Sequence, residues 1–206
     1  MNLFKRAPKT ILLFALCLCL SACAAGPEAP EVRVRALRRP FTDTAHVSGR
    51  AVLTADYGER VYTWTVSIDG SAQAGTMTVE EPENVAGTML QWSDGKTLLS
   101  CEDVTLETGP LSDRLSPAEA IPTLLSICQT GQVLECGWEN DLLYAKLAHS
   151  SEDNISGLCW FEGETLRRCE LTEAGKTLIT LDFSDFTLSE GDASAPSAQK
   201  QTQKEA

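Results

Sequence analysis

Apolar side chains recur at every second position through most of the segment 41–188, and this period restricts what the chain can fold into. From residue 62 to residue 68 the large apolar side chains occupy the even positions, and threonine and serine fill the odd ones. Such alternation is typical of half-buried β-strands. Ten or so short strands are expected, from the segments 48–55, 60–68, 74–80, 86–92, 96–101, 104–107, 133–138, 142–147, 155–161, 166–171 and 177–186.

The connections between these segments are short, as at Glu162-Gly163 and Ala174-Gly175. Parallel neighbours need crossovers of a dozen or more residues, so the pattern predicts an antiparallel meander. The expected fold class is therefore mainly β.

One segment departs from the period of two. Ser116 and Glu119 have the spacing of a capping box, and apolar residues then follow at helical intervals as far as Thr130-Gly131. Pro122 would remove one backbone hydrogen bond from the interior of such a helix. We therefore expect a short turn, then a helix from about Pro122 that covers part of the sheet.

The N-terminus has the features of an export signal. Basic residues precede the apolar run 11–20, which is too short to span a bilayer. The run ends in Leu20-Ser21-Ala22-Cys23, which resembles a bacterial lipobox. The resemblance implies a signal peptide at 1–22, a diacylated (palmitate-bearing) Cys23, and a location on the outer face of the cell membrane.

Residues 23–40 are expected to form a lipidated linker. Four arginines at 33, 35, 38 and 39 either lie against lipid headgroups or belong to a solvated linker or first strand. The segment 189–206 lacks aromatic residues and is expected to be a disordered tail. The folded β domain is then 41–188.

Charge and composition exclude several function classes. The formal net charge is −12, whereas nucleic-acid binding requires clustered Lys and Arg. The chain has only 2 His, and neither His46 nor His149 lies in a nucleophile motif. We expect a non-enzymatic protein without catalytic residues, metal ligands or cofactor.

Five cysteines follow Cys23, at 101, 128, 136, 159 and 169, so they cannot all pair within one chain. Cys159 and Cys169 flank a turn, and a hairpin would bring them face to face. The alternative is that these thiols are buried as small apolar side chains.

Large side chains on the predicted strands would line the concave face of a twisted sheet. Either they pack into a dry core, or the hollow stays partly open and binds an acyl chain. The candidate ligand-binding residues are Tyr62, Trp64, Leu90, Trp92, Trp138 and Trp160.

The chain resembles the LolA/LppX superfamily of lipid- and lipoprotein-binding proteins. The resemblance rests on residues 75–83 (GTMTVEEPE), on Leu115-Ser116-Pro117 before the helix, and on the closing strand 179–186. It is nearest to the small lipoproteins of that fold in spore-forming Gram-positive bacteria, the GerS-like germination lipoproteins. It implies a curved antiparallel half-barrel with one or two covering helices.

Two functions follow from this resemblance and from the strand pattern. The first is a membrane-anchored lipoprotein that binds lipid or lipoprotein acyl chains in the apolar hollow. The second is a protein-interaction lipoprotein that assists a cell-envelope enzyme, for example in sporulation or germination, through a sheet face or edge strand.

The lipobox makes a direct prediction. Cys23→Ser should abolish metabolic labelling with palmitate and release the protein from the membrane fraction, because the acyl chains supply the anchoring energy. Cys101→Ser is the control and should remain labelled. Fatty acid on the Cys23→Ser protein would contradict the assignment.

Overall fold

The computed structural model describes residues 28–41, 45–93, 96–102, 104–108, 115–149 and 154–190. The expected signal peptide, Cys23 and the tail beyond residue 190 lie outside these ranges. Within them, no helix combines the length and the apolar character needed to cross a membrane.

The described strands form one antiparallel sheet of eleven, which confirms the predicted fold class. The spatial order is β6-β5-β4-β3-β2-β1-β11-β10-β9-β8-β7. Each expected segment corresponds to one strand. The bounds are β1 (Ala45–Asp56), β2 (Val61–Gly70), β3 (Ala74–Glu81), β4 (Met89–Ser93), β5 (Lys96–Cys101), β6 (Val104–Thr108), β7 (Gln132–Glu139), β8 (Leu142–Ala148), β9 (Ile155–Glu162), β10 (Thr165–Glu173) and β11 (Lys176–Glu190).

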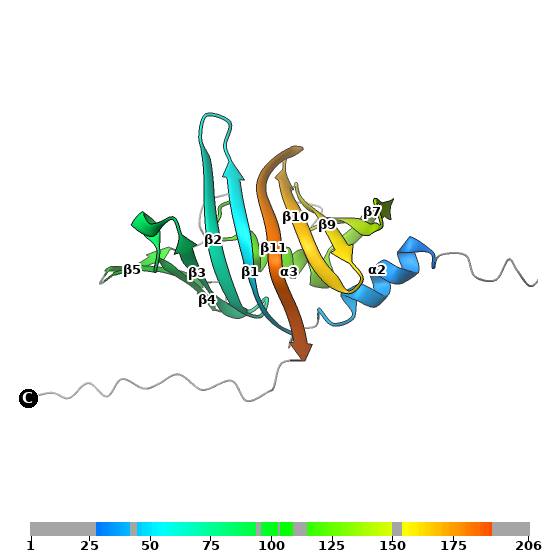
Figure 1. Cartoon of the computed structure of the whole chain (residues 1–206), viewed down its shortest axis with the longest axis horizontal. Helices are drawn as coiled ribbons and strands as arrows, with labels where there is room; N and C mark the ends of the chain where they lie inside the picture. Colours follow the sequence, from blue (N-terminus) through cyan, green and yellow to red (C-terminus); the bar gives the residue numbers. More distant parts are fainter. Residues whose placement is uncertain are drawn as a thin grey trace, which may run out of the picture.

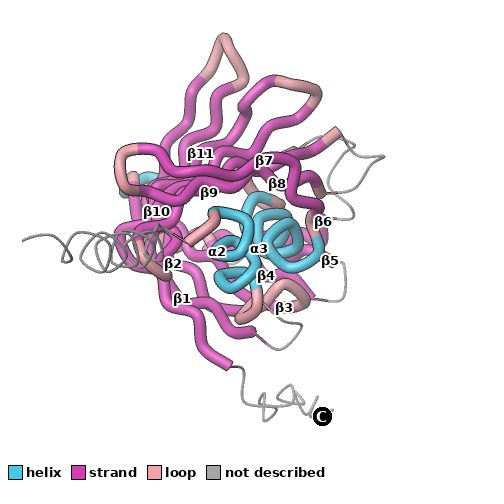
Figure 2. Tube along the Cα trace, turned by 90° about the vertical axis from the view of Figure 1, so that its right-hand side faces the viewer, coloured by secondary structure: helices cyan, strands magenta, loops and turns pink. Residues whose placement is uncertain are grey.

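The sheet is strongly curved and does not close on itself, which agrees with the expected half-barrel. β5 and β7 lie toward opposite ends of the molecule in Figure 1, and in Figure 2 the strands wrap around the helices. Residues of positive φ form the tight turns, among them Asn140 (φ 48°), Gly163 (61°) and Gly175 (81°). These turns keep successive strands adjacent and antiparallel.

The two faces of the sheet differ in chemistry. In β1 the buried Ala51, Leu53 and Ala55 alternate with more exposed residues. The convex face carries cross-strand ion pairs, including Arg50 Nε to Glu80 Oε2 at 2.6 Å. The period of two therefore separates an apolar concave face from a solvated convex face.

Helix α3 (Ala120–Thr130) fills the hollow of the sheet. Its side chains Ile121, Leu124 and Ile127 are at most 1% exposed and belong to the continuous core. The helix contacts β8, β9 and β10. Burial of this apolar face is the main contribution of the helix to stability.

The start of α3 differs from the expected capping box. Ser116 Oγ donates a hydrogen bond to Glu119 Oε2 at 3.2 Å, but no side chain caps the helix amides. The helix begins at Ala120, two residues before Pro122. Proline is tolerated there because the amides of a first turn have no partner within the helix.

Helix α2 (Pro30–Arg38) corrects the expectation of a linker or first strand. Val34 and Leu37 lie one helical turn apart, and both are buried. Arg38 donates to the carbonyl oxygens of Cys128 (2.8 Å), Gln129 (3.2 Å) and Gly131 (2.6 Å). The segment is thus part of the fold. The positive charge of Arg38 stabilises the C-terminal end of α3, where the helix dipole is negative.

The end of β11 also differs from the expectation. Ser189 and Glu190 were assigned to the tail, but they pair with His46 and Ala45 of β1. Partner strands can order a polar segment that could not fold alone.

The packing of α2 can be measured by truncating one side chain. Leu37→Ala should lower the free energy of unfolding by about 2–5 kcal/mol, because Leu37 is only 7% exposed. Val32→Ala is the matched control on the same helix, where Val32 is 53% exposed, and should change stability by less than about 0.5 kcal/mol. Equal urea midpoints for the two variants would contradict the docking of α2.

Glu119 should make stability depend on pH. Burial raises its pKa, the hydrogen bonds from Ser116 lower it, and the charge of Glu173 raises it again, with a net increase. The folded state therefore holds the Glu119 proton more tightly than the unfolded chain, and stability falls as pH rises through this pKa. Glu119→Gln should match the wild type below the ordinary glutamate pKa and be more stable at neutral pH.

Urea denaturation of wild type and Glu119→Gln at acid and neutral pH measures this difference. Glu59→Gln, at an exposed position in the β1–β2 hairpin, is the control and should follow the wild type at both pH values. A Glu119→Gln protein that is less stable than the wild type at neutral pH would contradict the raised pKa of Glu119 in the folded state.

Candidate functional site

The six predicted ligand-binding residues do not form one site. Leu90 and Trp92 are buried in the core, at 3% and 5% exposure. The Trp92 indole donates from Nε1 to the carbonyl oxygen of Ser71 at 2.9 Å and lies against Gly75, where a Cβ would collide with the ring. These two side chains are structural members of the packed interior.

Tyr62 and Trp64 lie together near the N-terminal end of β2. Their rings stack with centroids 5.6 Å apart and an interplanar angle of 9°. Tyr62 is 39% exposed, whereas Trp64 packs against the core. Among the six predicted residues, Tyr62 and Trp64 are the two whose rings contact each other and are partly exposed to solvent.

Trp138 and Trp160 lie on other parts of the sheet. Trp138 is on the edge strand β7 and is 48% exposed. Trp160 was expected to line the hollow, but its neighbours Cys159 and Phe161 are the buried residues of β9, so Trp160 is on the convex face. Its Nε1 donates to Glu139 Oε2 at 3.0 Å, and the Arg168 guanidinium lies 5.8 Å from its ring centroid. Ligand binding by the six residues stays a prediction.

The structure shows an open hydrogen-bonding edge that the sequence analysis missed. β1 pairs with β2 from Val61 to Gly70, but the β3 register reaches only from Gly70 to Thr65. Residues 61–64 of β2 thus have a described strand on one side only. In an antiparallel ladder alternate residues turn their N–H and C=O groups to the same neighbour, so two of these four residues point away from β1.

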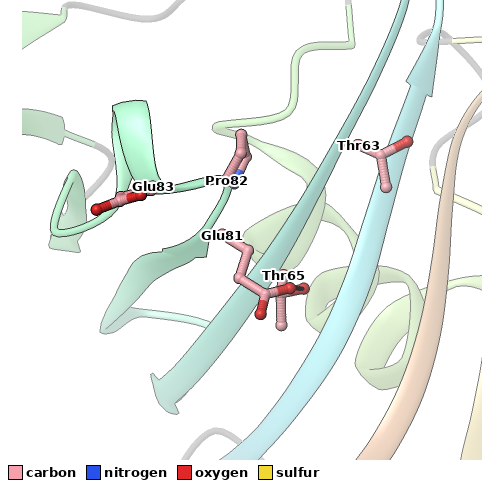
Figure 3. A pocket seen from close by; sticks show the side chains of 5 residues that line it. All are labelled: Thr63, Thr65, Glu81, Pro82 and Glu83. Atoms are coloured by element: carbon pink, nitrogen blue, oxygen red, sulfur yellow. Dashed lines mark hydrogen bonds between the residues drawn. The ribbon is translucent and has the colours of Figure 1, made fainter.

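A hollow of about 500 Å³ lies beside this edge, and Figure 3 shows its lining. It is formed by Thr63 and Thr65 of β2 and by Glu81, Pro82 and Glu83, where the chain leaves β3 for the turn η2 (Glu83–Val85). Thr65 Oγ1 donates to Glu81 Oε2 at 2.9 Å. We call these five residues together with the backbone of 61–64 the β2 notch.

Apolar atoms form most of the lining of the β2 notch, and polar groups are placed among them. Glu81 and Glu83 contribute two carboxylates, and Thr63 and Thr65 contribute hydroxyl groups. Pro82 directly follows the last residue of β3, and a proline cannot donate to a strand ladder. The structure shows how far β2 continues past that end, because residues 61–64 pair with β1 and have no partner in β3.

Acidic residues also surround the tip of the β1–β2 hairpin. Burial raises the pKa of Tyr57, and the charges of Glu173, Glu119 and then Tyr62 raise it further. Glu173 Oε1 accepts a hydrogen bond from the amide of Leu115 at 3.2 Å. Negative charge therefore lies near this hairpin at the β2 notch and around Tyr57, while Arg60 beside Tyr62 and Lys176 near Gly58 bring positive charge to its tip.

The hollow side of the sheet is closely packed where α3 covers it. The space between α3 and β1 lined by Phe41, Val47 and Leu125, among others, measures about 10 Å³. Nearby, Ser126 Oγ and His149 Nε2 are 3.2 Å apart, a contact that joins α3 to the end of β8. An acyl chain would require far more room than this space provides.

Comparisons with known proteins find similarity of structure but not of sequence. No protein-family model matches the chain. No curated protein sequence matches it either. Solved structures of several bacterial proteins do match.

One is a LolA superfamily protein from Nitrosomonas europaea, at 12% identity and a TM-score of 0.41, covering 74% of this chain and 92% of that one. Another is a putative outer membrane lipoprotein-sorting protein domain from Vibrio parahaemolyticus, at 10% identity and a TM-score of 0.45, covering 81% and 96%. A third is the complex of the CwlD amidase with the GerS lipoprotein from Clostridioides difficile, at 12% identity and a TM-score of 0.43, covering 79% and 97%. Each of these is a similarity of structure at 10–12% sequence identity.

Proposed function

We propose that this protein is a binding protein of the cell envelope that holds an extended, basic segment of a partner protein in the β2 notch. The observation that carries the proposal is the length of β2, which continues four residues beyond the β3 register and leaves residues 61–64 with a neighbouring strand on one side. The proposal follows the second of the two functions expected from the sequence.

The backbone of the notch supports strand addition. Two residues of the stretch 61–64 present amide and carbonyl groups on the side where β3 has ended. An extended peptide that adds a strand to an exposed edge gains main-chain hydrogen bonds whatever its sequence. This part of β2 is already ordered by its pairing with β1, so little ordering entropy is lost on its side of the interface.

The charge of the notch determines the chemistry of the partner segment. Glu81 and Glu83 lie at its border, and the chain as a whole carries a formal charge of −12. A segment with Lys or Arg at alternate positions would place those side chains beside the two carboxylates. Charge complementarity of this kind raises association rates and selects among partners.

The aromatic pair Tyr62 and Trp64 supplies apolar contact on the opposite face of the same strand. An added strand exposes successive side chains to the two faces in turn. Side chains on one face of the partner segment would therefore meet Glu81 and the threonines, while those on the other face would meet the stacked rings. The β2 notch would therefore bind a strand with one basic and one apolar face in preference to strands that lack either face.

Binding of an acyl chain in the hollow receives less support from the same structure. The side chains of α3 cover the concave face over β8, β9 and β10, and the space beside Phe41 and Leu125 is about 10 Å³. A larger space of about 310 Å³ lies instead between α2 and the strands β10 and β11. We further propose that the role is one of binding rather than catalysis, on an exported and lipid-anchored chain, as the lipobox and the charge pattern led us to expect.

Site-specific photo-crosslinking in the native envelope tests the β2 notch. A benzophenone amino acid at Thr63 should give a discrete adduct with a partner protein, whereas the same residue at Lys146, on the fully paired strand β8, should not. Glu81→Lys combined with Glu83→Lys should reduce the adduct about tenfold, because it reverses the charge that attracts the partner.

Glu162→Lys combined with Glu164→Lys is the matched control, with the same spacing and charge change in the exposed β9–β10 turn. It should leave the adduct unchanged. Equal adducts at positions 63 and 146, or equal losses with the two charge reversals, would refute binding at the notch. Co-purification of stoichiometric lipid without detergent, seen by native mass spectrometry, would favour the acyl-chain function instead.

A further inference from the structure

Three cysteine thiols meet in the core where α3 covers the sheet. Cys128 lies on α3, Cys159 on β9 and Cys169 on β10, and each is at most 1% exposed. Cys159 Sγ donates to Cys169 Sγ at a distance of 3.6 Å. The thiol of Cys159 also raises the pKa of Cys128, and so does burial, so Cys159 interacts with both of the other thiols.

The strand register places Cys159 directly opposite Cys169. Residues opposite each other in an antiparallel pair have Cα atoms about 4.5 or 5.5 Å apart, depending on the type of pair. Disulfides occur at Cα separations of about 4.4–6.8 Å, so both types fall within the range. The ladder therefore holds the two residues at a Cα separation that a disulfide accepts, and the sulfurs have to close from 3.6 Å to form the bond.

We propose that Cys159 and Cys169 form a disulfide in the mature protein and that Cys128 remains a buried thiol. The inference rests on the expected export of the chain, since disulfides persist in extracytoplasmic compartments. It does not depend on the β2 notch or on any partner.

Cys128 is the less suitable partner for Cys159 because it comes from the helical layer above the sheet. Arg38 holds the carbonyl group of Cys128 by a 2.8 Å hydrogen bond, and the neighbouring Leu124 and Ile127 are packed in the core. A bond from Cys128 to Cys159 would pull α3 toward the sheet. The bond between Cys159 and Cys169 joins residues that the ladder already holds together.

The reaction is an ordinary thiol–disulfide exchange with a protein or small-molecule disulfide as oxidant. The thiolate of Cys169 attacks one sulfur of the oxidant, forms a mixed disulfide and releases the first thiol. The thiolate of Cys159 then attacks the sulfur of Cys169 and releases the second thiol. Two electrons pass to the oxidant, and the two cysteine protons end on the two thiols released.

The exchange must precede the closure of the core. Donation from Cys128 lowers the pKa of Cys159, but the hydrogen bond to Cys169 and burial raise it more, and the net pKa is well above the ordinary value. A protonated and buried thiol is neither nucleophilic nor accessible to an oxidant. The bond therefore forms while the β9–β10 hairpin is made but α3 has not yet covered it.

Differential alkylation of the full chain from its native envelope tests the proposal. The thiols are blocked by N-ethylmaleimide in denaturant, and after reduction a heavy-isotope form of the reagent is added. Cys159 and Cys169 should carry the heavy label, and Cys101, Cys128 and Cys136 the light one. Trypsin cleaves after Arg167 and Arg168, so the unreduced digest should contain two peptides joined only through sulfur.

Light label on both Cys159 and Cys169, or a peptide in which Cys128 is joined to Cys159, would overturn the proposal. A pair of variants provides a second measurement. Reduction in denaturant, followed by refolding with the reductant present, should lower the Tm of the wild type and of Cys128→Ala by about 5 °C or more relative to the oxidised proteins. It should leave the Tm of Cys169→Ala unchanged.

Cys128→Ala is the matched control because it also removes one buried thiol but leaves the proposed bond intact. A wild-type Tm that does not respond to the reductant, or a Cys128→Ala protein that has lost the response, would refute the pairing. Peptide mapping of the wild type decides the question even if a variant fails to fold. A missing disulfide would leave the crosslinking result at Thr63 unaffected, so the two proposals fail separately.

Discussion

The structure depends on the pairing of the first and last described strands. β1 and β11 are far apart in the sequence, yet they lie side by side from the pair Ala45–Glu190 to the pair Ala55–Ile179. This contact joins two meanders, β2 to β6 and β7 to β10, into one sheet. Without it each meander would expose an additional edge and neither could enclose a helix.

The combined sheet curves, and its concave face must be covered by apolar side chains. α3 provides most of them, and its C-terminal carbonyl groups are bound by Arg38 of α2. The segment before the sheet therefore stabilises the helix that fills the sheet. The same packing occupies the concave face under α3, and this is why an edge of the sheet is a better candidate for binding than its hollow.

The β2 notch arises from a mismatch in strand length. β1 and β2 form a long hairpin that extends beyond its neighbours, while β3 ends at Pro82 and turns away (Figures 1 and 3). Natural edges are commonly protected by charged residues against unwanted pairing. At this edge the charges of Glu81 and Glu83 are of one sign, so in the proposed binding mode they would disfavour acidic strands and favour basic ones.

The sequence by itself determined the strands, the tight turns and the apolar face of α3, because these follow from periods of two and of 3.6 residues and from local turn chemistry. Tertiary structure decided the rest. Trp160 was expected on the concave face, but its two neighbours Cys159 and Phe161 are the buried residues of β9, so Trp160 lies on the convex face. Residues 30–38 have the composition of a linker, but they form a helix. Burial of Val34 and Leu37 against the rest of the core stabilises that helix. The facing of Cys159 and Cys169 was expected from the sequence, because the register of a hairpin follows from its turn and from the alternation of apolar side chains. The open edge at 61–64 was not, because it depends on how far β2 and β3 each extend in the assembled sheet.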